Sequence, residues 1–555
     1  MRRTHPNLTP IRIRLLCAAC CVLLAAASTY ASGDEELGKP PLRTGIHASE
    51  KVTFSGGQTA SGSYFQFAVP DGWNPADGLV IWNHGFDLSP VGPDPDLGPL
   101  VGVQLDQGYA VAASSYSLTG WALFQTVADL EEMIQEFHTQ HGIPDSVLIY
   151  GASLGGIVTA QAVERAQLGN VVGALPICGA MAGSRVWDGG LDLRLLYDAV
   201  CADVPGAAIP GGAAGLPFPP DPTFDEDALE QAVDACTGIL VPASSRTLQQ
   251  RQNLEALLDA TEIPENFLLR DMGFVTFALA DLVYDPAKLA GGQAMDNFNV
   301  DYGDAALDAA IQRVKADPAA RNLLVDHFTP SGKVDDVKIV SIHTDQDGLI
   351  LVENTSDYAA KVPAGNFTLG VVVEDEPSHC GFTEAELAAA WESLRGWVAG
   401  LPQPTASDLQ MTCEGLVAGS LAGGPCRIDP DFDVRSIDRR VRPRTVCVDD
   451  DDTLCIDGRF AVETAWKDFE GKEGEGSAVP LTAETGAFWF FGPNNLELML
   501  KVLDGRQIND HFWVFYGALS NVEYTINVTD TVTLEQKVYM NPLGNFASNA
   551  DVEAF

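Results

Sequence analysis

The stretch Val147-Leu148-Ile149-Tyr150-Gly151-Ala152-Ser153-Leu154-Gly155-Gly156 carries the strongest structural signal in the chain. Its first four residues have the pattern of a buried strand, and the apolar spacing after Ser153 is helical. A serine between two glycines at such a junction matches the G-x-S-x-G turn, where the chain bends so sharply that the serine Oγ projects from the sheet edge. A chance match in a Gly/Ser loop is the weaker interpretation, because the strand and helix context is present.

A serine acts as a nucleophile only with a base within hydrogen-bond reach and an acid that orients the base. Three histidines follow Ser153 inside the same predicted domain: His327, His343 and His379. His379 lies in a loop between the last predicted strand and the final helix, from which it can reach back over the sheet. His343 ends an apolar strand, where packing explains it, so we predict His379 as the general base.

The orienting acid is expected between the serine and the histidine in chain order. Asp345 and Asp347 both follow the penultimate predicted strand. Asp345 fits a solvated turn or cap position. Asp347 stands deeper in the loop, before a glycine and an apolar pair, and we predict it as the acid.

A developing oxyanion needs two backbone donors, one of them from the residue after the nucleophile. Leu154 supplies the first N–H, and the loop after the strand 79–82 supplies the second from Gly85 or Phe86. Tyr116 and Trp121 follow another strand on the same edge. They are expected either to line the substrate pocket or to pack beneath a cap.

Short apolar runs alternate with helical patterns from residue 45 to 400, as in a mostly parallel sheet covered by helices. Residues 184–330 interrupt this rhythm. A structureless loop of that length is implausible, so we expect a helical cap insertion over one end of the sheet.

These motifs together resemble the α/β-hydrolase superfamily over about residues 50–400: the His84-Gly85-Phe86 loop, the serine turn, the acid loop and the late histidine. The resemblance implies an α/β fold with a largely parallel eight-stranded sheet, a cap after the sixth strand, and hydrolysis through an acyl-enzyme. It does not fix the substrate, and our leading hypothesis is hydrolysis of carboxylic esters. Cys380 directly after His379 is similar to secreted tannase and feruloyl esterase relatives. Those place a cysteine before the nucleophile, where this chain has Ala152.

Two other functions are kept as alternatives. A proline-type serine peptidase would use acidic cap residues to hold a substrate amine. A non-catalytic surface protein would use the hydrolase fold as a scaffold only, although such a scaffold has no physical need for all three triad residues. No cofactor or metal is expected.

The composition changes after residue 400. Residues 401–440 are interpreted as a linker, and residues 441–555 as a small antiparallel, β-sandwich-like domain, because aromatic and β-branched runs alternate with turn residues. This domain resembles a module at the ends of other exported bacterial proteins, and an unknown partner is one interpretation of its role.

The amino terminus has the pattern of a signal peptide, residues 1–31, cleaved near Ala31. The expected location is therefore secreted or periplasmic. The formal net charge is −43 for the whole chain. Nucleic acid and anionic membrane surfaces are disfavoured as partners, and no stretch has the length of a membrane span. The expected partner is a small or polymeric ester substrate.

Eight cysteines remain after residue 31, an even number that in an exported chain predicts disulfides rather than zinc ligands. Proximity along the chain favours three pairs, and the two remaining cysteines are both expected at the same sheet edge. The predicted pairs are Cys201–Cys236, Cys413–Cys426, Cys447–Cys455 and Cys178–Cys380.

Overall fold

The computed structural model describes residues 52–89, 91–211, 217–219, 224–261, 263–298, 300, 302, 305–434, 447, 451–509, 511–531 and 535–555. The predicted signal peptide, residues 1–31, lies outside these ranges. Among the helices within them, none is both long enough and apolar enough to cross a lipid bilayer.

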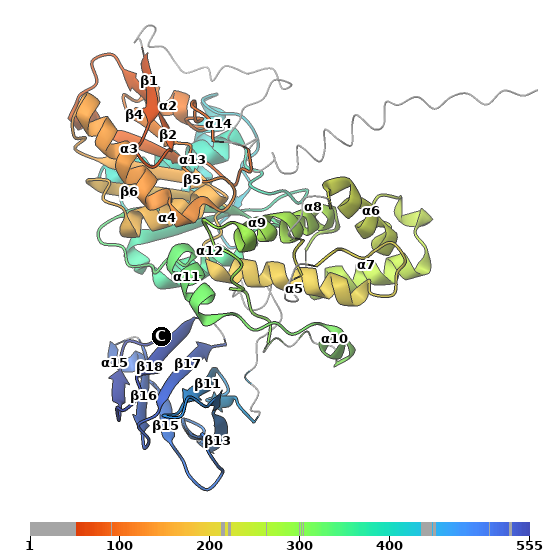
Figure 1. Cartoon of the computed structure of the whole chain (residues 1–555). Coiled ribbons are helices and arrows are strands. Elements are labelled where there is room, and N and C mark those ends of the chain that lie inside the picture. The colour runs from red at the N-terminus through yellow and green to blue at the C-terminus, as the bar shows by residue number, and fades with distance from the viewer. Residues whose placement is uncertain are drawn as a thin grey trace, which may run out of the picture.

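One large mixed sheet organises the first part of the chain (Figure 1). Its spatial order is β1-β2-β4-β3-β5-β6-β7-β8-β9. The strands are β1 (Val52–Gln58), β2 (Tyr64–Pro70), β3 (Leu79–Asn83), β4 (Ala110–Ser114), β5 (Val147–Ala152), β6 (Val171–Ile177), β7 (Lys338–Thr344), β8 (Phe367–Val372) and β9 (Ile428–Asp429).

The expected eight-stranded, largely parallel sheet needs correction. The strands from β4 to β8 in this order are parallel, whereas β1, β2 and β9 pair antiparallel to their neighbours. The extra strand is β9, which adds two residues to the edge of β8. The domain is thus an α/β domain with a nine-stranded mixed sheet.

Helices cover both faces of this sheet because its central strands are apolar on both sides. In β3, Leu79 and Ile81 pack into one core, and Val80 and Trp82 pack into the other. The first core is covered by α3 (Thr126–His141), α4 (Leu154–Arg165) and α12 (Glu353–Lys361). The second is covered by α2 (Val101–Asp106), α13 (Glu384–Val398) and α14 (Ala406–Ala418).

The interval between β6 and β7 is helical and extends from the sheet as a cap (Figure 1). Its elements are α5 (Ser184–Val200), α6 (Glu226–Thr237), the short turn η4 (Ala243–Ser245), α7 (Leu248–Thr261), the short turn η5 (Glu265–Phe267), α8 (Leu268–Gly273), the π-helical turn η6 (Phe274–Ala278), α9 (Leu279–Tyr284), α10 (Ala305–Ala310) and α11 (Pro318–Phe328). A buried ion pair at 2.9 Å joins Arg321 of α11 to Asp188 of α5.

The sequence predicts a linker over residues 401–440, but part of this segment is folded against the sheet. Helix α14 begins with a capping box of Thr405 and Asp408, and its Leu409 packs into the second core of the sheet. Strand β9 follows and hydrogen-bonds to β8. The described residues up to about 430 therefore belong to the sheet domain.

The C-terminal domain folds as two antiparallel sheets around one core, as expected for a β-sandwich-like unit (Figure 1). One sheet holds β10 (Leu454–Ile456), β11 (Phe460–Lys467), β12 (Glu473–Glu475), β17 (Glu523–Asp530) and β18 (Gln536–Asn541). The other holds β13 (Ser477–Thr482), β14 (Thr485–Trp489), β15 (Leu498–Asp504), β16 (Phe512–Ala518) and β19 (Ser548–Asp551); a short helix, α15 (Arg506–Asn509), follows β15.

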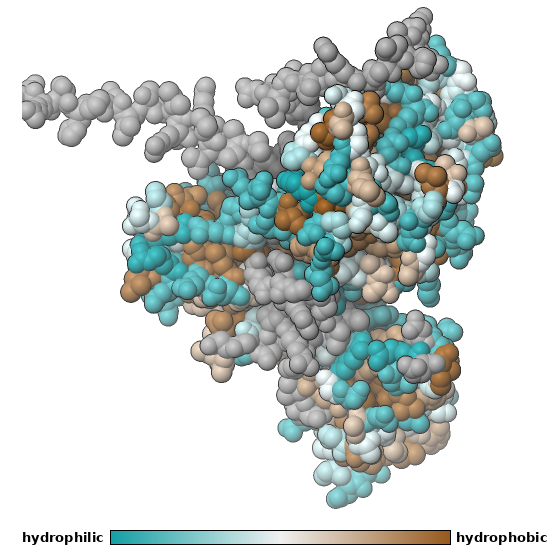
Figure 2. Space-filling view, turned by 180° about the vertical axis from the view of Figure 1, so that it is seen from behind, coloured by the Kyte–Doolittle hydropathy of each residue, from teal (hydrophilic) through white to brown (hydrophobic). Residues whose placement is uncertain are grey.

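Alternation along β17 shows why the chain forms this sandwich. Tyr524, Ile526 and Val528 point into the core between the sheets, and the residues between them are more exposed. On the face drawn in Figure 2, apolar side chains reach the surface in separated patches among hydrophilic ones. An ion pair between Lys315 and Glu463 joins this domain to the cap segment.

All four predicted disulfides are confirmed. The pair with the greatest sequence separation is Cys178–Cys380, whose members stand 202 residues apart. It ties the end of β6 to the loop that precedes α13.

Candidate active site

The serine turn sits between β5 and α4 and has the strained backbone that the motif requires. Ser153 has φ of 58°, in the left-handed region that residues with a Cβ rarely adopt. The glycines of the motif, Gly151 and Gly155, leave no room for a side chain, because other backbone atoms lie close to them. A Cβ on Gly155 would lie 2.0 Å from the Asn83 carbonyl oxygen, and one on Gly151 would lie 2.3 Å from the Gly155 carbonyl oxygen. The turn can therefore pack against the end of β3 only with these glycines.

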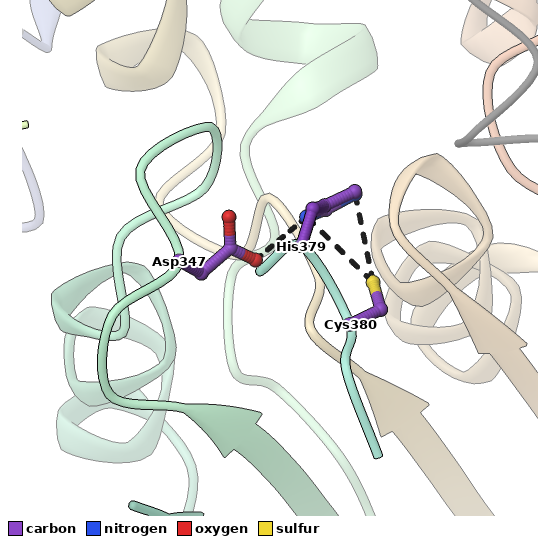
Figure 3. A group of neighbouring side chains, drawn as sticks. All are labelled: Asp347, His379 and Cys380. Atoms are coloured by element: carbon purple, nitrogen blue, oxygen red, sulfur yellow. Dashed lines mark hydrogen bonds and ion pairs between the residues drawn. The ribbon is translucent and has the colours of Figure 1, made fainter. Parts of the chain in front are cut away.

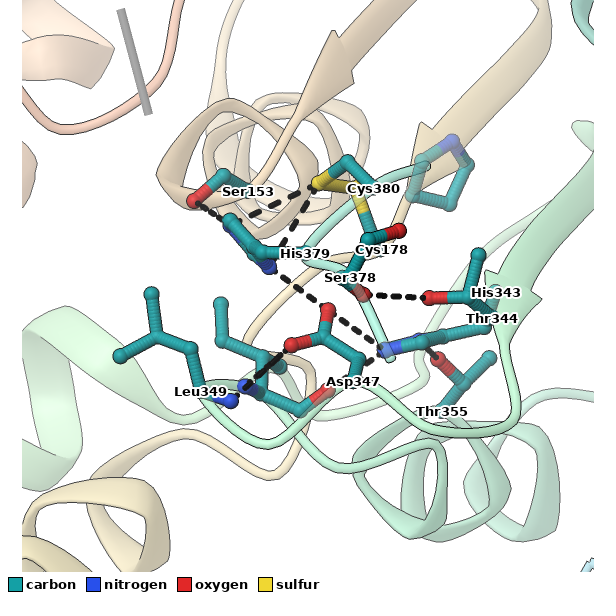
Figure 4. The surroundings of a disulfide bond; sticks show 12 residues. Ser153, Cys178, His343, Thr344, Asp347, Leu349, Thr355, Ser378, His379 and Cys380 are labelled. Atoms are coloured by element: carbon teal, nitrogen blue, oxygen red, sulfur yellow. Dashed lines mark hydrogen bonds and ion pairs between the residues drawn. A yellow bond between two sulfur atoms is a disulfide. The ribbon is translucent and has the colours of Figure 1, made fainter. Parts of the chain in front are cut away.

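Ser153, His379 and Asp347 come together from three separate strand ends (Figure 4). His379 Nε2 lies 2.9 Å from Ser153 Oγ, and His379 Nδ1 lies 2.6 Å from Asp347 Oδ2. Asp347 is fully buried, and the Ser153 residue is only 5% exposed. The three side chains form one continuous hydrogen-bonded relay.

The acid loop prepares Asp347 to remain ionised. Its Oδ1 accepts the backbone N–H groups of Leu349 and Ile350 at 3.0 and 3.1 Å, leaving Oδ2 for His379. Burial alone would raise the pKa of Asp347, but His379 and His343 hold it well below its ordinary value. The carboxylate is thus available to orient the imidazole.

His343 is hydrogen-bonded to the acid loop and to α12. It is fully buried, and its Nδ1 lies 2.8 Å from Thr355 Oγ1 while its Nε2 lies 2.6 Å from the Ile350 carbonyl oxygen. The carbonyl can only accept, so Nε2 carries the proton. His343 is accordingly a packed, hydrogen-bonded histidine that braces the loop.

The two other candidates lie outside the relay. Asp345 Oδ1 accepts the backbone N–H of Glu374 at 2.8 Å and so links the acid loop to the loop that carries His379. His327 lies on α11 and its ring packs against Phe124. Neither is hydrogen-bonded to His379 within the described chain.

The loop after β3 lies beside the serine. Phe86, Leu154 and Ser153 all line one cavity, and Gly85 precedes Phe86 in the same loop. The N–H of Leu154 is in the first turn of α4, where the helix offers no acceptor of its own. These positions suit backbone donors directed at a carbonyl oxygen bound beside Ser153.

Tyr116 does not line this cavity. It is fully buried with φ of 52°, and its ring stacks on His84 with the ring centroids 4.1 Å apart. Its hydroxyl donates to the His84 carbonyl oxygen at 3.2 Å. Burial lowers the pKa of His84, which favours a neutral ring. Tyr116 therefore supports the loop of Gly85 and Phe86 from behind.

Trp121 does line the cavity, and it also joins the cap to the sheet domain. Its indole N–H donates to the Ala278 carbonyl oxygen of η6 at 2.7 Å, and its ring packs against Phe86 and Phe274. The cavity has a volume of about 110 Å³. Apolar cap residues form much of its wall, so it suits an apolar part of a ligand.

The cluster of Asp347, His379 and Cys380 has the proximity of a metal site (Figure 3). However, the Cys380 sulfur is bonded to Cys178, which removes the thiolate that a metal would need (Figure 4). The remaining two groups are already hydrogen-bonded to each other. Their chemistry fits a proton relay better than a metal centre.

Comparisons with known proteins gave distant structural likenesses. No family model matches the chain, and no curated protein matches its sequence. Feruloyl esterase B from Aspergillus oryzae is 12% identical, with 66% of this chain and 85% of that one covered and a TM-score of 0.35. Candida antarctica lipase A in its closed state is 11% identical, with coverages of 70% and 87% and a TM-score of 0.34. Esterase RhEst1 from a Rhodococcus species is 16% identical, with coverages of 63% and 99% and a TM-score of 0.31.

Several residues around the site had no signal in the sequence. The cap contributes Trp187, Asp271 and Phe274 to the cavity wall, and α12 contributes Asn354. Glu374 accepts hydrogen bonds from the backbone and hydroxyl of Ser378, next to His379. Burial raises the pKa of Glu374 to about 7. None of these belongs to a local motif, so only the folded chain brings them to the site.

Proposed function

We propose that this chain is a serine hydrolase that cleaves carboxylic esters, with Ser153 as nucleophile, His379 as general base and Asp347 as orienting acid. The observation that carries the proposal is the continuous relay from Ser153 Oγ through His379 to Asp347, at 2.9 and 2.6 Å. A scaffold without catalysis would have no use for a strained serine aligned in this way.

In the proposed reaction, Ser153 Oγ attacks the ester carbonyl carbon while His379 Nε2 takes the hydroxyl proton. The carbonyl oxygen becomes an oxyanion, which the backbone N–H groups of Leu154 and of Gly85 or Phe86 would stabilise. The C–O bond to the alcohol then breaks, and His379 returns the proton to the leaving alcohol. Water attacks the acyl-enzyme by the same steps and releases the acid.

An ester substrate is favoured over a peptide by the chemistry of the cavity wall. Its surface is mostly apolar, and the two cap carboxylates that line it already have partners. Arg270 pairs with Asp271, and the Tyr302 hydroxyl donates to Asp192 at 2.7 Å. A peptidase that captures an amino terminus needs an uncompensated carboxylate there.

We further propose that the chain is exported after loss of residues 1–31 and acts as a sheet domain with a cap over residues 184–330 and a C-terminal β domain. The four disulfides support an oxidising compartment. A partner for the β domain belongs to the same proposal.

The decisive experiment compares the wild type with S153A. A fluorophosphonate probe should label the wild type and not the variant. A panel of nitrophenyl esters and aminoacyl-nitroanilides should show turnover of the esters only. Absence of labelling, or equal turnover by S153A, would refute the nucleophile, and preference for the nitroanilides would instead favour a peptidase.

A further inference from the structure

The cavity beside Ser153 is not uniformly apolar. Phe86, Trp121, Trp187 and Phe274 give it aromatic walls, but Asp271 and Asn354 also line it. A buried polar group is costly unless it is hydrogen-bonded, so each of these side chains calls for a partner.

Asp271 has one oxygen satisfied. Its Oδ1 accepts from Nε and Nη2 of Arg270 at 3.1 and 3.0 Å. No hydrogen bond to its Oδ2 occurs in the described part of the chain, although the residue is only 3% exposed. An ionised carboxylate can accept on both oxygens. Asp271 thus offers an acceptor in the wall of the cavity.

Asn354 also lines the cavity, but its unpartnered acceptor has almost no accessible surface. Its Nδ2 donates to the Leu351 carbonyl oxygen at 2.9 Å, and its buried Oδ1 has no partner among the described residues. The opposite orientation of the amide would place oxygen against oxygen, so the assignment follows from the hydrogen bond. Asp271 Oδ2 and Asn354 Oδ1 are therefore both acceptors for which the described residues provide no donor.

The missing donor is better supplied by a hydroxyl than by an ammonium group. Arg270 already compensates the charge of Asp271, and its guanidinium lies over the Phe267 ring at 3.7 Å. Burying a second cation in an aromatic cavity beside this pair would cost desolvation energy with little charge left to balance it. A hydroxyl brings the donor at a lower desolvation cost.

Asp271 is held at a fixed position relative to the proposed triad. The turn η5 just before α8 packs on both loops that carry triad residues. Asn266 Nδ2 donates to the Pro377 carbonyl oxygen at 3.1 Å, and a Cβ on Gly348 would lie 2.6 Å from the Phe267 ring. A group bound by Asp271 would therefore lie at a constant offset from Ser153.

We propose that Asp271 forms a hydroxyl-binding subsite, so that the ester bears a hydroxyl group on the apolar part that enters the cavity. This inference rests on the proposed ester hydrolysis and adds to it the chemical class of the substrate. A site built to accept a hydroxyl hydrogen bond discriminates strongly against analogues that lack the donor.

The test uses two series of esters: nitrophenyl phenylacetates with a hydroxyl, methoxy or aminomethyl group at each ring position, and benzyl acetates substituted in the same way. The measured quantity is the ratio of kcat/KM between hydroxyl and methoxy members. This ratio is independent of how much of a preparation is folded. The wild type should favour the hydroxyl member at one ring position by about tenfold or more.

The variant D271N should lower this ratio by about tenfold, because Arg270 would take the amide oxygen and leave an N–H₂ donor facing the substrate. The control D259N removes the same charge from an exposed position of α7 in the same cap and should keep the wild-type ratio.

A ratio near one in both wild-type series, an unchanged ratio in D271N, or preference for the aminomethyl members would each overturn the subsite. Calorimetric titration of S153A with the same esters measures binding without turnover. If the wild type hydrolyses none of these esters, the proposed function fails, and the dissociation constants still decide the subsite. If hydrolysis depends on Ser153 but shows no hydroxyl preference, only the subsite fails.

Discussion

The sheet edge that carries Ser153, His379 and Asp347 differs from the cap in how its side chains are positioned. At the edge, each side chain lies in the loop that follows a strand, and defined hydrogen bonds hold it there. In the cap, the groups that meet the cavity come from helices that are interrupted by a π-helical turn and joined by ion pairs, one buried and one partly buried. Backbone geometry thus places the proposed chemistry, and side-chain packing shapes the proposed selectivity.

The largest effect expected is at the sheet edge. S153A should lower kcat by roughly 10⁵- to 10⁶-fold, because triad residues act as a unit and the other two are then without function. The melting temperature and the binding of intact esters, measured by calorimetry, should stay close to wild type. If S153A retained most of the activity, the catalytic residues would not lie at this edge of the sheet.

The second prediction compares two aspartates of one loop. D347N should lower kcat by about 10³- to 10⁴-fold, because an amide favours the wrong tautomer of His379. D345N, the matched control, removes only a contact to the Glu374 backbone and should cost far less activity. Steady-state kinetics of the two variants at one pH suffices. A reversed order would assign the orienting role to Asp345.

The third prediction tests the junction between edge and cap. W121F removes the indole hydrogen bond to the Ala278 carbonyl oxygen and should raise KM by about tenfold, with a smaller change in kcat. W187F is the control, since Trp187 lines the same cavity but its indole N–H has no hydrogen-bond partner among the described residues. Equal effects of the two variants would mean that ring volume alone matters at this junction.

The smallest effect on activity is expected from E374Q, which instead changes how stability depends on pH. Burial raises the pKa of Glu374 to about 7 in the folded state from an ordinary value of 4.5. The folded state therefore binds this proton more tightly, and the resulting stability is complete below pH 4.5 and lost as the pH rises through 7.

The neutral glutamine of E374Q should remove about 2 kcal/mol of this pH dependence, measured by urea unfolding at pH 5 and pH 8. E376Q makes the same change at an exposed position of the same loop and serves as the control. We expect the unfolding free energy to fall more from pH 5 to pH 8 in the wild type than in E374Q. An equal fall in the two proteins would contradict a proton held on Glu374.

The sequence was sufficient wherever position along a strand determines position in space. The serine turn predicts where Ser153 lies, and the ends of β7 and β8 bring Asp347 and His379 to the same edge. The pairing of Cys178 with Cys380 follows from the same reasoning and is confirmed. These inferences need only the order of parallel strands.

The sequence was insufficient where one short segment packs against a distant one. Strand β9 has two residues and no pattern of its own, so the sequence of residues 401–440 predicts a linker. The capping box of Thr405 and Asp408 is the one local signal of the helix that forms there. The sequence gives Tyr116 and Trp121 the same prediction, yet Tyr116 packs behind a loop and Trp121 lines the cavity. Asp271 has no local motif, and only the packing of α8 brings it to the cavity wall.

The Cys178–Cys380 disulfide also has a topological consequence. Every residue of the cap and the whole acid loop lie between these two cysteines, so that part of the chain is a closed covalent ring. A protease that cuts the ring once cannot release a fragment from it. The nicked molecule would run as one band on a non-reducing gel and as two after reduction, with Ser153 on one piece and His379 on the other.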